Sequence, residues 1–458
     1  MIPIPAEIFK AYDIRGIVGK TLNDQWVELI GQAIGSEAIN QGNSSVVVGR
    51  DGRLSGPAMR DALVRGIVST GANVIDIGMV PTPVVYFATH HLDSGASVSI
   101  TGSHNPPDYN GFKVMIGGST LSGDAIQDLY KRITDRNFLK GSGNCENQDV
   151  NELYLDRIIS DVHLNKKFKI VIDCGNGVAG ALAPELYNRL GCETIELFTT
   201  VDGTFPNHHP DPIDEKNLVD LKQAVRDNDA DIGLAFDGDG DRLGVVTSTG
   251  EVIWPDRQMI LFSEDILNRQ PCAEIIFDVK CTAALRSAIE DMGGVATMYK
   301  TGHSLIKSKL RESGAALAGE MSGHIFFQER WYGFDDGLYT GARLLELLSN
   351  KDESPDTVFS KLPNPINTPE LRLELQEGQQ HELIKELVAN ANFTNATTHT
   401  IDGLRVEFSN GFGLVRASNT TPTAILRFEA TSVEGISEIQ DKFRALFTLV
   451  RPDLALPF

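Results

Sequence analysis

The sequence predicts an α/β protein in which three related α/β domains precede a smaller C-terminal α+β domain. Three observations support this fold class: a strand–helix–strand pattern recurs three times, glycine- or proline-containing linkers separate the copies, and the pattern changes after the third copy. The length of 458 residues agrees with this prediction. At about 150 residues per domain, a chain of this size holds three or four domains.

Each copy of the pattern starts with a short β-branched strand that ends at an aspartate, namely Asp51, Asp173 or Asp278. A helix follows, then one or two glycines that suit a helix C-terminus, and then a second apolar strand. This order predicts parallel pairing of the two strands, as in a βαβ unit. Chance recurrence of such units in a large α/β protein is the alternative explanation. The three units cover residues 46–78, 170–197 and 275–298.

Linkers and a change of pattern place the domain boundaries. The linkers are residues 141–144, 248–250 and 362–367. After the last linker, a half-exposed strand, a helix, several short strands and a final amphipathic helix predict an antiparallel sheet with helices on it. These segments include residues 371–375, 382–388, 414–415, 424–428 and 436–447. The predicted domains are residues 1–149, 150–251, 252–364 and 365–458.

The composition indicates a folded protein that does not bind nucleic acid. Hydrophobic residues make up 41% of the chain, which excludes intrinsic disorder. The 62 acidic residues outnumber the 41 basic ones, and the net charge of −21 repels phosphate backbones. Five cysteines without a Cys-x-x-Cys pair favour free thiols in a reducing compartment. We expect a soluble cytoplasmic protein, because neither a signal peptide nor a run of about 18 apolar residues is evident.

Three aspartates at alternate positions form the strongest chemical signal. Asp237, Asp239 and Asp241 follow an apolar strand and are separated by glycines, so their carboxylates can converge. Converging carboxylates repel each other unless a cation offsets their charge, and an all-oxygen set favours Mg²⁺ or Ca²⁺. An EF-hand is excluded, because it needs glycine and glutamate where Arg242 and Ser248 stand. An acidic surface turn is the alternative.

A second polar loop, residues 101–106, also follows an apolar strand and carries Ser103. Its small residues would leave the Ser103 hydroxyl accessible on a tight turn. The Gly-x-Ser-x-Gly elbow of the α/β-hydrolases is absent because Asn105 occupies its last position, and His104 is a poor triad base because it adjoins the serine. Lys113 lies shortly downstream of the same loop. Considered alone, the loop is better explained as an ordinary surface loop.

A third loop, in the last domain, combines an arginine with hydroxyl and amide groups that suit a phosphate dianion. An ordinary Asn/Pro turn is the alternative. Its residues are Arg416, Ser418, Asn419 and Thr420. Other polar residues lie at or just after apolar runs, where sheet-end loops gather ligands, although a salt bridge or a turn explains each of them singly. They are Tyr12, Arg15, Lys280, His303, Glu320, Ser322 and His324.

Together these motifs resemble the α-D-phosphohexomutase superfamily over nearly the whole chain, from Tyr12 to the loop at Arg416. The serine loop and the acidic loop are specific in combination. Within the superfamily the sequence resembles the bacterial phosphomannomutase/phosphoglucomutase branch, whose sugar loop matches residues 319–324. Met321 stands where phosphoglucosamine mutases usually carry glutamine, which argues against that branch. The resemblance implies mixed sheets and one active site in the central cleft.

The resemblance also implies a role for each candidate residue. Ser103 would carry a phosphoryl group, and one oxygen of this phosphoserine would join the three aspartates in binding Mg²⁺. His324, Lys113 and His303 are the candidates for the general base. By position, the phosphoserine would be surrounded by His104, Lys113 and Arg242, and the sugar hydroxyls would be held by Glu320 and Ser322. The phosphate already on the substrate would be bound by Arg416, Ser418, Asn419 and Thr420. The remaining cleft would be lined by Tyr12, Arg15, Lys280, His303 and His324.

The resulting hypothesis is a reversible interconversion of hexose 6-phosphate and hexose 1-phosphate, for both mannose and glucose. It would proceed through the phosphoserine and a hexose 1,6-bisphosphate, which also acts as activator. The alternatives are a Mg²⁺-dependent sugar phosphatase and a non-enzymatic divalent-cation-binding module. Small sugar phosphates are the expected partners, without nucleic acid or membrane, and the family likeness favours a monomer. The resemblance further implies a supply of nucleotide sugars for lipopolysaccharide or exopolysaccharide.

Overall fold

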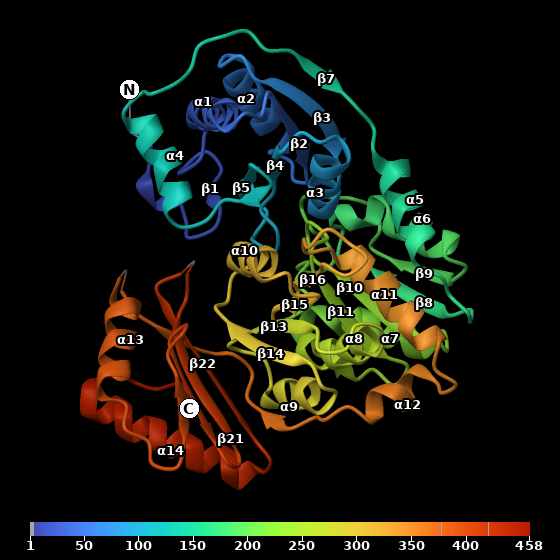
Figure 1. Cartoon of the computed structure of the whole chain (residues 1–458), viewed down its shortest axis with the longest axis vertical. Helices are drawn as coiled ribbons and strands as arrows, with labels where there is room; N and C mark the ends of the chain where they lie inside the picture. The colour runs from blue at the N-terminus through green and yellow to red at the C-terminus, as the bar shows by residue number, and fades with distance from the viewer. Residues whose placement is uncertain (1–3, 377, 420) are drawn as a thin grey trace.

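The computed structural model describes residues 4–376, 378–419 and 421–458. The chain folds into four domains, each with its own sheet, which follow one another in sequence. The domains lie along an arc, so that the first and the fourth face each other across an opening (Figure 1). The predicted fold class is therefore confirmed. Among the helices of the described ranges, none has both the length and the apolar character needed to cross a membrane.

The first domain has a seven-stranded sheet with helices on both faces. Val46 and Val48 belong to the core beneath α1 and α2, whereas Val47 belongs to the core beneath α3, as the alternation of side chains along a strand requires. Its strands are β1 (Ile14–Ile17), β2 (Ser45–Arg50), β3 (Asn73–Met79), β4 (Ala96–Ile100), β5 (Tyr109–Ile116), β6 (Ser119–Thr120) and β7 (Cys145–Asn147). Its helices are η1 (Ala6–Ile8, a 3₁₀ helix), α1 (Asp24–Asn40), α2 (Gly56–Val68), α3 (Thr82–His91) and α4 (Asp124–Thr134).

The second domain has five strands, β8 (Lys169–Asp173), β9 (Glu193–Leu197), β10 (Ile232–Phe236), β11 (Leu243–Thr247) and β12 (Val252–Ile253). The single helix predicted between the two strands of the second unit is in fact two pieces, because Pro184 fits only the first turn of α6 and the chain before it forms a 3₁₀ turn. The helices are α5 (Asn151–Asp161), η2 (Val178–Ala181), α6 (Ala183–Arg189), η3 (Glu215–Leu218) and α7 (Val219–Asp227).

The third domain has four strands, β13 (Glu274–Asp278), β14 (Val295–Tyr299), β15 (Leu317–Gly319) and β16 (Ile325–Phe327). Helix α11 also packs on β10 and β11, so the second and third domains share one hydrophobic core. The helices of this domain are α8 (Pro255–Arg269), α9 (Ala283–Asp291), α10 (His303–Ser313), α11 (Gly337–Ser349) and α12 (Pro355–Ser360).

One strand order recurs in the first three sheets. A central strand pairs in parallel with both of its neighbours, and one neighbour then pairs antiparallel with the next strand of the chain. The orders are β3-β2-β4-β5, β9-β8-β10-β11 and β14-β13-β15-β16. Asp51, Asp173 and Asp278 lie at the end of, or directly after, the three central strands, so the recurring pattern of the sequence is a recurring topology.

The fourth domain has a sheet whose described strand pairs are antiparallel, and helices α13 and α14 pack on it. Arg405 joins it to the third domain by donating hydrogen bonds to the carbonyls of Val279 and Cys281, both at 2.7 Å. The elements are β17 (Ile366–Asn367), β18 (Leu371–Glu374), α13 (Gln379–Asn390), β19 (Thr397–His399), β20 (Leu404–Phe408), β21 (Gly411–Ala417), β22 (Thr423–Ala430) and α14 (Val433–Val450).

Close packing of α1 on α2 gives a first test of the fold. A Cβ atom on Gly31 would overlap the carbonyl oxygen of Leu63, so Gly31→Ala must push the two helices apart. We expect the free energy of unfolding to fall by about 1–3 kcal/mol, measured by urea denaturation. Glu28→Ala, which removes only an exposed ion pair with Arg65, is the control and should change it by less than about 0.5 kcal/mol. Equal stabilities of wild type and Gly31→Ala would contradict this packing.

Candidate active site

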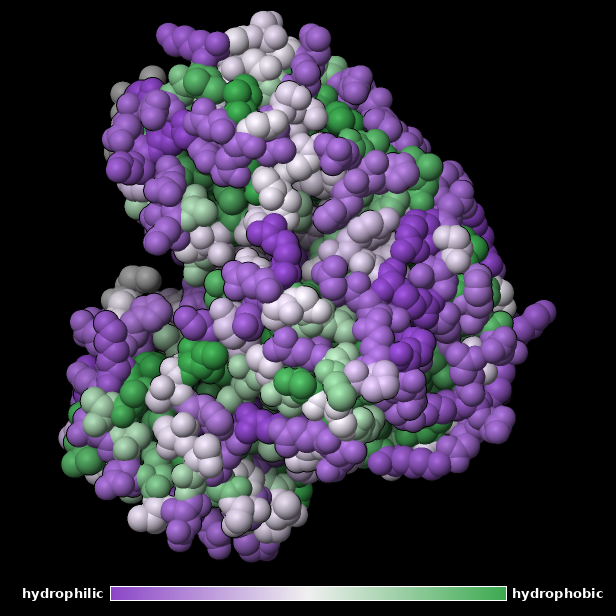
Figure 2. Space-filling model, viewed as in Figure 1, coloured by the Kyte–Doolittle hydropathy of each residue, from purple (hydrophilic) through white to green (hydrophobic). Residues whose placement is uncertain are grey.

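A cavity of about 580 Å³ is lined by residues from all four domains, among them most of the predicted site residues but not Asp237, Asp239 or Asp241. Figure 2 shows the corresponding hollow in the surface, between the first and the fourth domain. The predicted residues in its lining are Tyr12, Arg15, Ser103, His104, Lys113, Arg242, Lys280, His303, Glu320, Ser322, His324, Arg416, Ser418 and Asn419. The predicted phosphate ligand Thr420 lies outside the described residues.

Three loops in equivalent positions bring the polar groups together. Each loop follows the outer parallel strand of its sheet, β4, β10 or β15, and leads into an antiparallel strand. The loops carry Ser103, the three aspartates and Glu320 in turn. Loops at the carboxyl ends of parallel strands are where α/β proteins bind their ligands. The repeated topology therefore brings three loops with different functional groups close to one another.

The loops also touch one another. A Cβ atom on Gly238 would overlap the carbonyl oxygen of Ser103, so only glycine permits this approach of the acidic loop to the serine loop. Arg242 and His324 form an isolated antiparallel bridge that joins the acidic loop to the third loop. The spacing of the chemical groups is thus fixed by backbone contacts.

Ser103 has a backbone conformation that favours glycine, with φ at 47°. Its Oγ lies 3.1 Å from His104 Nδ1 and donates a hydrogen bond of 3.2 Å to Asp237 Oδ2. The residue is buried at the floor of the cavity. Non-glycine residues in this conformation persist only where their surroundings enforce it, and they concentrate at functional sites. The serine hydroxyl is thereby held against the acidic loop.

Asp237, Asp239 and Asp241 are fully buried, and one oxygen of each lies within 4.8 Å of the others. Lys113 Nζ donates to Asp239 Oδ2 at 2.8 Å and also to Asp241 Oδ2. The Oδ1 atoms of Asp239 and Asp241 have no hydrogen-bond partner in the described part of the chain. Buried carboxylate oxygens that accept no hydrogen bond are a suitable ligand set for a hard divalent cation, so these residues could hold one.

The acidic loop depends on positive side chains for its charge balance. Burial raises the pKa of Asp237 to about 8. Burial opposes ionisation of Asp239 too, but the Lys113 ammonium outweighs it and the pKa of Asp239 falls below its usual range. Conversely, Asp239 and Asp241 raise the pKa of Lys113 well above normal although burial lowers it. Without a bound cation, Lys113 and Arg242 supply the compensating charge.

Asp211 is a site residue that the sequence analysis missed. Its Oδ1 accepts from Arg242 Nη1 at 3.2 Å, while Arg242 Nε donates to Asp237 Oδ2 at 3.0 Å. Burial raises the pKa of Asp211, but Arg242 and His104 lower it more, to about 2. Arg242 Nη2 is buried and has no partner among the described residues, so it remains available to an anion in the cavity. Asp211 follows no apolar run, and this explains why it gave no signal.

His208 anchors the loop that carries Asp211. Its Nε2 lies 3.0 Å from both carboxylate oxygens of Asp173, at the end of β8. Burial lowers the pKa of His208, but the hydrogen bond and the charge of Asp173 raise it above normal.

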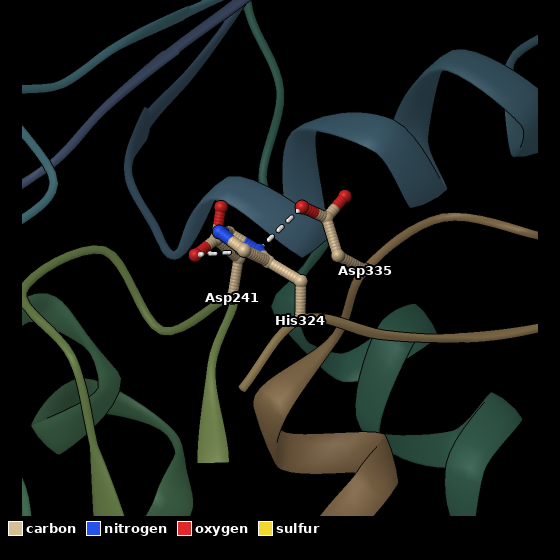
Figure 3. A group of neighbouring side chains, drawn as sticks. All are labelled: Asp241, His324 and Asp335. Atoms are coloured by element: carbon tan, nitrogen blue, oxygen red, sulfur yellow. Dashed lines mark ion pairs between the residues drawn. The ribbon is translucent and has the colours of Figure 1, made fainter. Parts of the chain in front are cut away.

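His324 lies between two carboxylates, as Figure 3 shows. Its Nδ1 is 2.9 Å from Asp335 Oδ2 and 3.6 Å from Asp241 Oδ1, and Asp335 Oδ1 also accepts from Lys307 Nζ at 2.7 Å. Burial lowers the pKa of His324, but Asp241 and Asp335 raise it above normal. For His303, burial and the Lys307 charge lower the pKa well below normal. Asp335, which follows no clear strand in the sequence, is the second residue that the analysis missed.

Two cationic residues of the cavity, Lys280 of the third domain and the phosphate-binding candidate Arg416 of the fourth, are held by acidic partners. Lys280 Nζ donates to Glu370 Oε1 at 2.7 Å, and Arg416 Nε donates to Asp402 Oδ2 at 2.9 Å. Arg416 Nη2 is buried without a hydrogen-bond partner among the described residues. Glu370 and Asp402 were not predicted, because they act on residues that are distant in sequence. The arrangement leaves donors of Arg416 available to an anion.

Glu320 presents the third loop to the cavity. It accepts a hydrogen bond from the Gly302 backbone N–H, and Ser322 Oγ donates to its Oε2 at 3.2 Å. Burial raises the pKa of Glu320. A carboxylate with an adjacent hydroxyl can hold two neighbouring hydroxyl groups of a sugar.

Family models match almost the entire chain. The models are described as phosphoglucomutase/phosphomannomutase, alpha/beta/alpha domains I, II and III, and the C-terminal domain of the same family. They match residues 6–140, 152–250, 254–366 and 370–446 in that order.

Full-length relatives are similar over the same span. A phosphomannomutase/phosphoglucomutase of Pseudomonas putida is 53% identical over 99% of this chain and 98% of its own. A phosphoglucomutase of Neisseria meningitidis is 55% identical over the whole of both chains. The crystal structure of a phosphoglucomutase/phosphomannomutase family protein from Burkholderia thailandensis superposes with a TM-score of 0.95 at 54% identity, and covers 99% of this chain and 100% of that one.

Removal of the Lys113 ammonium tests the charge balance of the acidic loop. Lys113→Met leaves buried carboxylates without their main partner, so we expect the free energy of unfolding in a chelator to fall by about 3–5 kcal/mol. A divalent cation should shrink this loss, because it takes over the compensation. Chemical denaturation with and without metal measures both effects.

Lys131→Met, on the exposed face of α4, is the matched control and should change the stability by less than about 0.5 kcal/mol in either condition. If Lys113→Met were as stable as wild type in the chelator, the proposed charge balance would be wrong.

The pair His208–Asp173 predicts a pH-dependent stability. Because folding raises the pKa of His208 above its usual 6.5, its contribution is complete below pH 6.5 and disappears as the pH rises through the folded-state pKa. His208→Gln should therefore lose roughly 1–2 kcal/mol at pH 5.5 and clearly less at pH 8.5, measured by denaturation at both values. A stability difference that grew with pH would contradict the assignment.

Proposed function

Because the chain belongs to the phosphoglucomutase/phosphomannomutase family, we propose that it is a hexose-phosphate mutase that reversibly interconverts the 6-phosphates and 1-phosphates of mannose and glucose. The observation that carries this proposal is the Ser103 hydroxyl, which lies 3.2 Å from a buried carboxylate at the floor of a cavity lined by all four domains. A sugar phosphatase could use the same acidic loop. Among the described residues that line the cavity, however, none favours hydrolysis over transfer to a sugar.

The reaction proceeds through two phosphoryl transfers. A free hydroxyl of the hexose phosphate attacks the phosphorus of phospho-Ser103, the Oγ–P bond breaks, and hexose 1,6-bisphosphate forms. The bisphosphate turns end over end, Ser103 Oγ attacks its other phosphate, and the isomeric monophosphate leaves. The phosphoenzyme is regenerated, so added hexose 1,6-bisphosphate acts as activator by phosphorylating a free Ser103.

The three general-base candidates differ in their protonation. His303 is neutral because burial and Lys307 lower its pKa, so it can accept the proton of the attacking hydroxyl. Lys113 and His324 are kept protonated by neighbouring carboxylates, so they can donate to the leaving oxygen. His104 and Arg242 flank the same serine and would contribute hydrogen bonds to the phosphoryl oxygens.

The metal proposal rests on Asp237, Asp239 and Asp241, with an oxygen of phospho-Ser103 as a further ligand. A bound Mg²⁺ would offset the charge of the phosphoryl oxygens during transfer. The Oδ1 atoms of Asp239 and Asp241 accept no hydrogen bond from the described residues, which supports this ligand set.

Substrate recognition is assigned to cavity residues of the third and fourth domains. Glu320 and Ser322 would hold the 3- and 4-hydroxyls, which glucose and mannose share, so activity on both sugars is expected. Arg416, Ser418 and Asn419, together with Thr420, would bind the phosphate that the substrate already carries. Tyr12, Arg15 and Lys280 would line the remaining part of the cleft. Placement of the phosphate loop on a separate domain allows that domain to close and exclude water.

We further assign the protein to the cytoplasm, as a monomer that supplies sugar 1-phosphates for nucleotide-sugar synthesis. The five cysteines support a reducing compartment, since the structure shows them as free thiols.

Replacement of the nucleophile tests this proposal. Ser103→Ala should lower mutase kcat by at least about 10⁴-fold, since a removed nucleophile abolishes the covalent route. Ser97→Ala is the matched control, because Ser97 lies buried on β4 and its hydroxyl has no hydrogen-bond partner among the described residues. Coupled assays for both sugars, together with a phosphate-release assay, measure the outcome.

Intact mass spectrometry after incubation with hexose 1,6-bisphosphate should show one phosphate on wild type and on Ser97→Ala, and none on Ser103→Ala. Stoichiometric release of inorganic phosphate from the substrate would identify a phosphatase instead.

A further inference from the structure

Arg53 is buried beneath the serine loop and donates hydrogen bonds to several backbone carbonyl groups of that loop. The guanidinium donates to the carbonyl oxygens of Ser103 at 2.8 Å, Asn105 at 2.6 Å, Pro106 at 2.5 Å and Tyr109 at 3.0 Å. Its side chain is 0% exposed, and it is not among the residues that line the cavity. Arg53 therefore contacts the loop of the nucleophile but does not reach the substrate.

Asp51 completes the support from the opposite end of the loop. Its Oδ2 accepts from Arg53 Nε at 3.2 Å, from Thr101 Oγ1 at 2.8 Å and from the Gly102 N–H at 3.1 Å. The carboxylate and the guanidinium thus hold the loop from residue 101 to residue 109 by one continuous set of hydrogen bonds.

The space around Arg53 is filled on every side described. A Cβ atom on Gly102 would overlap the guanidinium, and one on Gly203 of the second domain would come within 2.7 Å of Arg53 Cα. Phe205, also from the second domain, lies with its ring centroid 5.2 Å from Arg53 Cζ. These contacts restrict the guanidinium to the place where it meets the carbonyls of the serine loop.

These contacts explain how Ser103 keeps its left-handed conformation. A backbone strained in this way relaxes unless its surroundings over-determine it. A trans peptide also directs the His104 N–H opposite to the Ser103 carbonyl, away from Arg53, and no acceptor among the described residues takes that N–H. The N–H remains available to an anion at the serine.

We propose that Arg53 is a positioning residue for phosphoryl transfer: by drawing four carbonyls of the serine loop onto one planar cation, it sets the place and direction of the Ser103 oxygen. The proposal rests on the proposed mutase function. A lysine supplies the same charge but lacks the planar set of five donors, so it cannot reproduce the four bonds.

Arg53→Lys tests this role after incubation with hexose 1,6-bisphosphate, with equal phosphorylation of both proteins verified by intact mass. We expect kcat to fall at least about 100-fold, since small misplacements of a reacting atom have effects of this size. KM for hexose 1-phosphate should stay within about threefold, because the distal phosphate residues are untouched. Arg343→Lys in α11, which alters an equally buried arginine paired with Glu329, is the control and should leave kcat unchanged.

Gly102→Ala provides an independent test that keeps the arginine. Its Cβ displaces the guanidinium, so the same selective loss of kcat is expected, and this variant decides the question if Arg53→Lys does not fold. A kcat within about threefold of wild type, or equal losses in Arg53→Lys and Arg343→Lys, overturns the positioning role. Absence of mutase turnover in wild type would instead refute the proposed function, so the two failures are distinguishable.

Discussion

The burial of three carboxylates directly beneath a serine hydroxyl is the constraint on which the site depends. Asp237, Asp239 and Asp241 have no solvent exposure, so their charge must be compensated by fixed cations. Lys113 and Arg242 do this in the structure, and each also lines the cavity. The groups that stabilise the acidic loop are therefore the same groups that would meet a phosphoryl group. A change to Lys113 or Arg242 would therefore affect both the stability of the acidic loop and the binding of a phosphoryl group.

The threefold repeat explains how one chain brings such different groups together. Each of the first three sheets ends its outer parallel strand in a loop at the same edge, and the three edges converge on the cavity. The three loops differ in sequence, so each supplies different groups: one supplies a serine, one supplies carboxylates and one supplies a carboxylate with a hydroxyl. The fourth domain departs from the plan and adds a basic loop from the other side of the opening, visible in Figure 1.

Much of this arrangement could be predicted from the sequence, because its signals are local. Ser103 and the aspartates stand in short motifs directly after apolar strands, and the recurring pattern predicted the repeated sheets. The supporting residues could not be predicted in this way. Asp211, Asp335, Glu370 and Arg53 act through contacts that only the folded topology creates. The break between η2 and α6 escaped notice because the position of Pro184 in the first turn depends on where the helix begins.

The central claim is that the aspartates and the serine form one cation-dependent phosphoryl-transfer centre. A crystal structure of the phosphorylated protein with Mg²⁺ tests it most directly. The account predicts an ion about 2.1 Å from oxygens of Asp237, Asp239 and Asp241 and from one phosphate oxygen on Ser103. An ion bound elsewhere, or a phosphate on another residue, would contradict it.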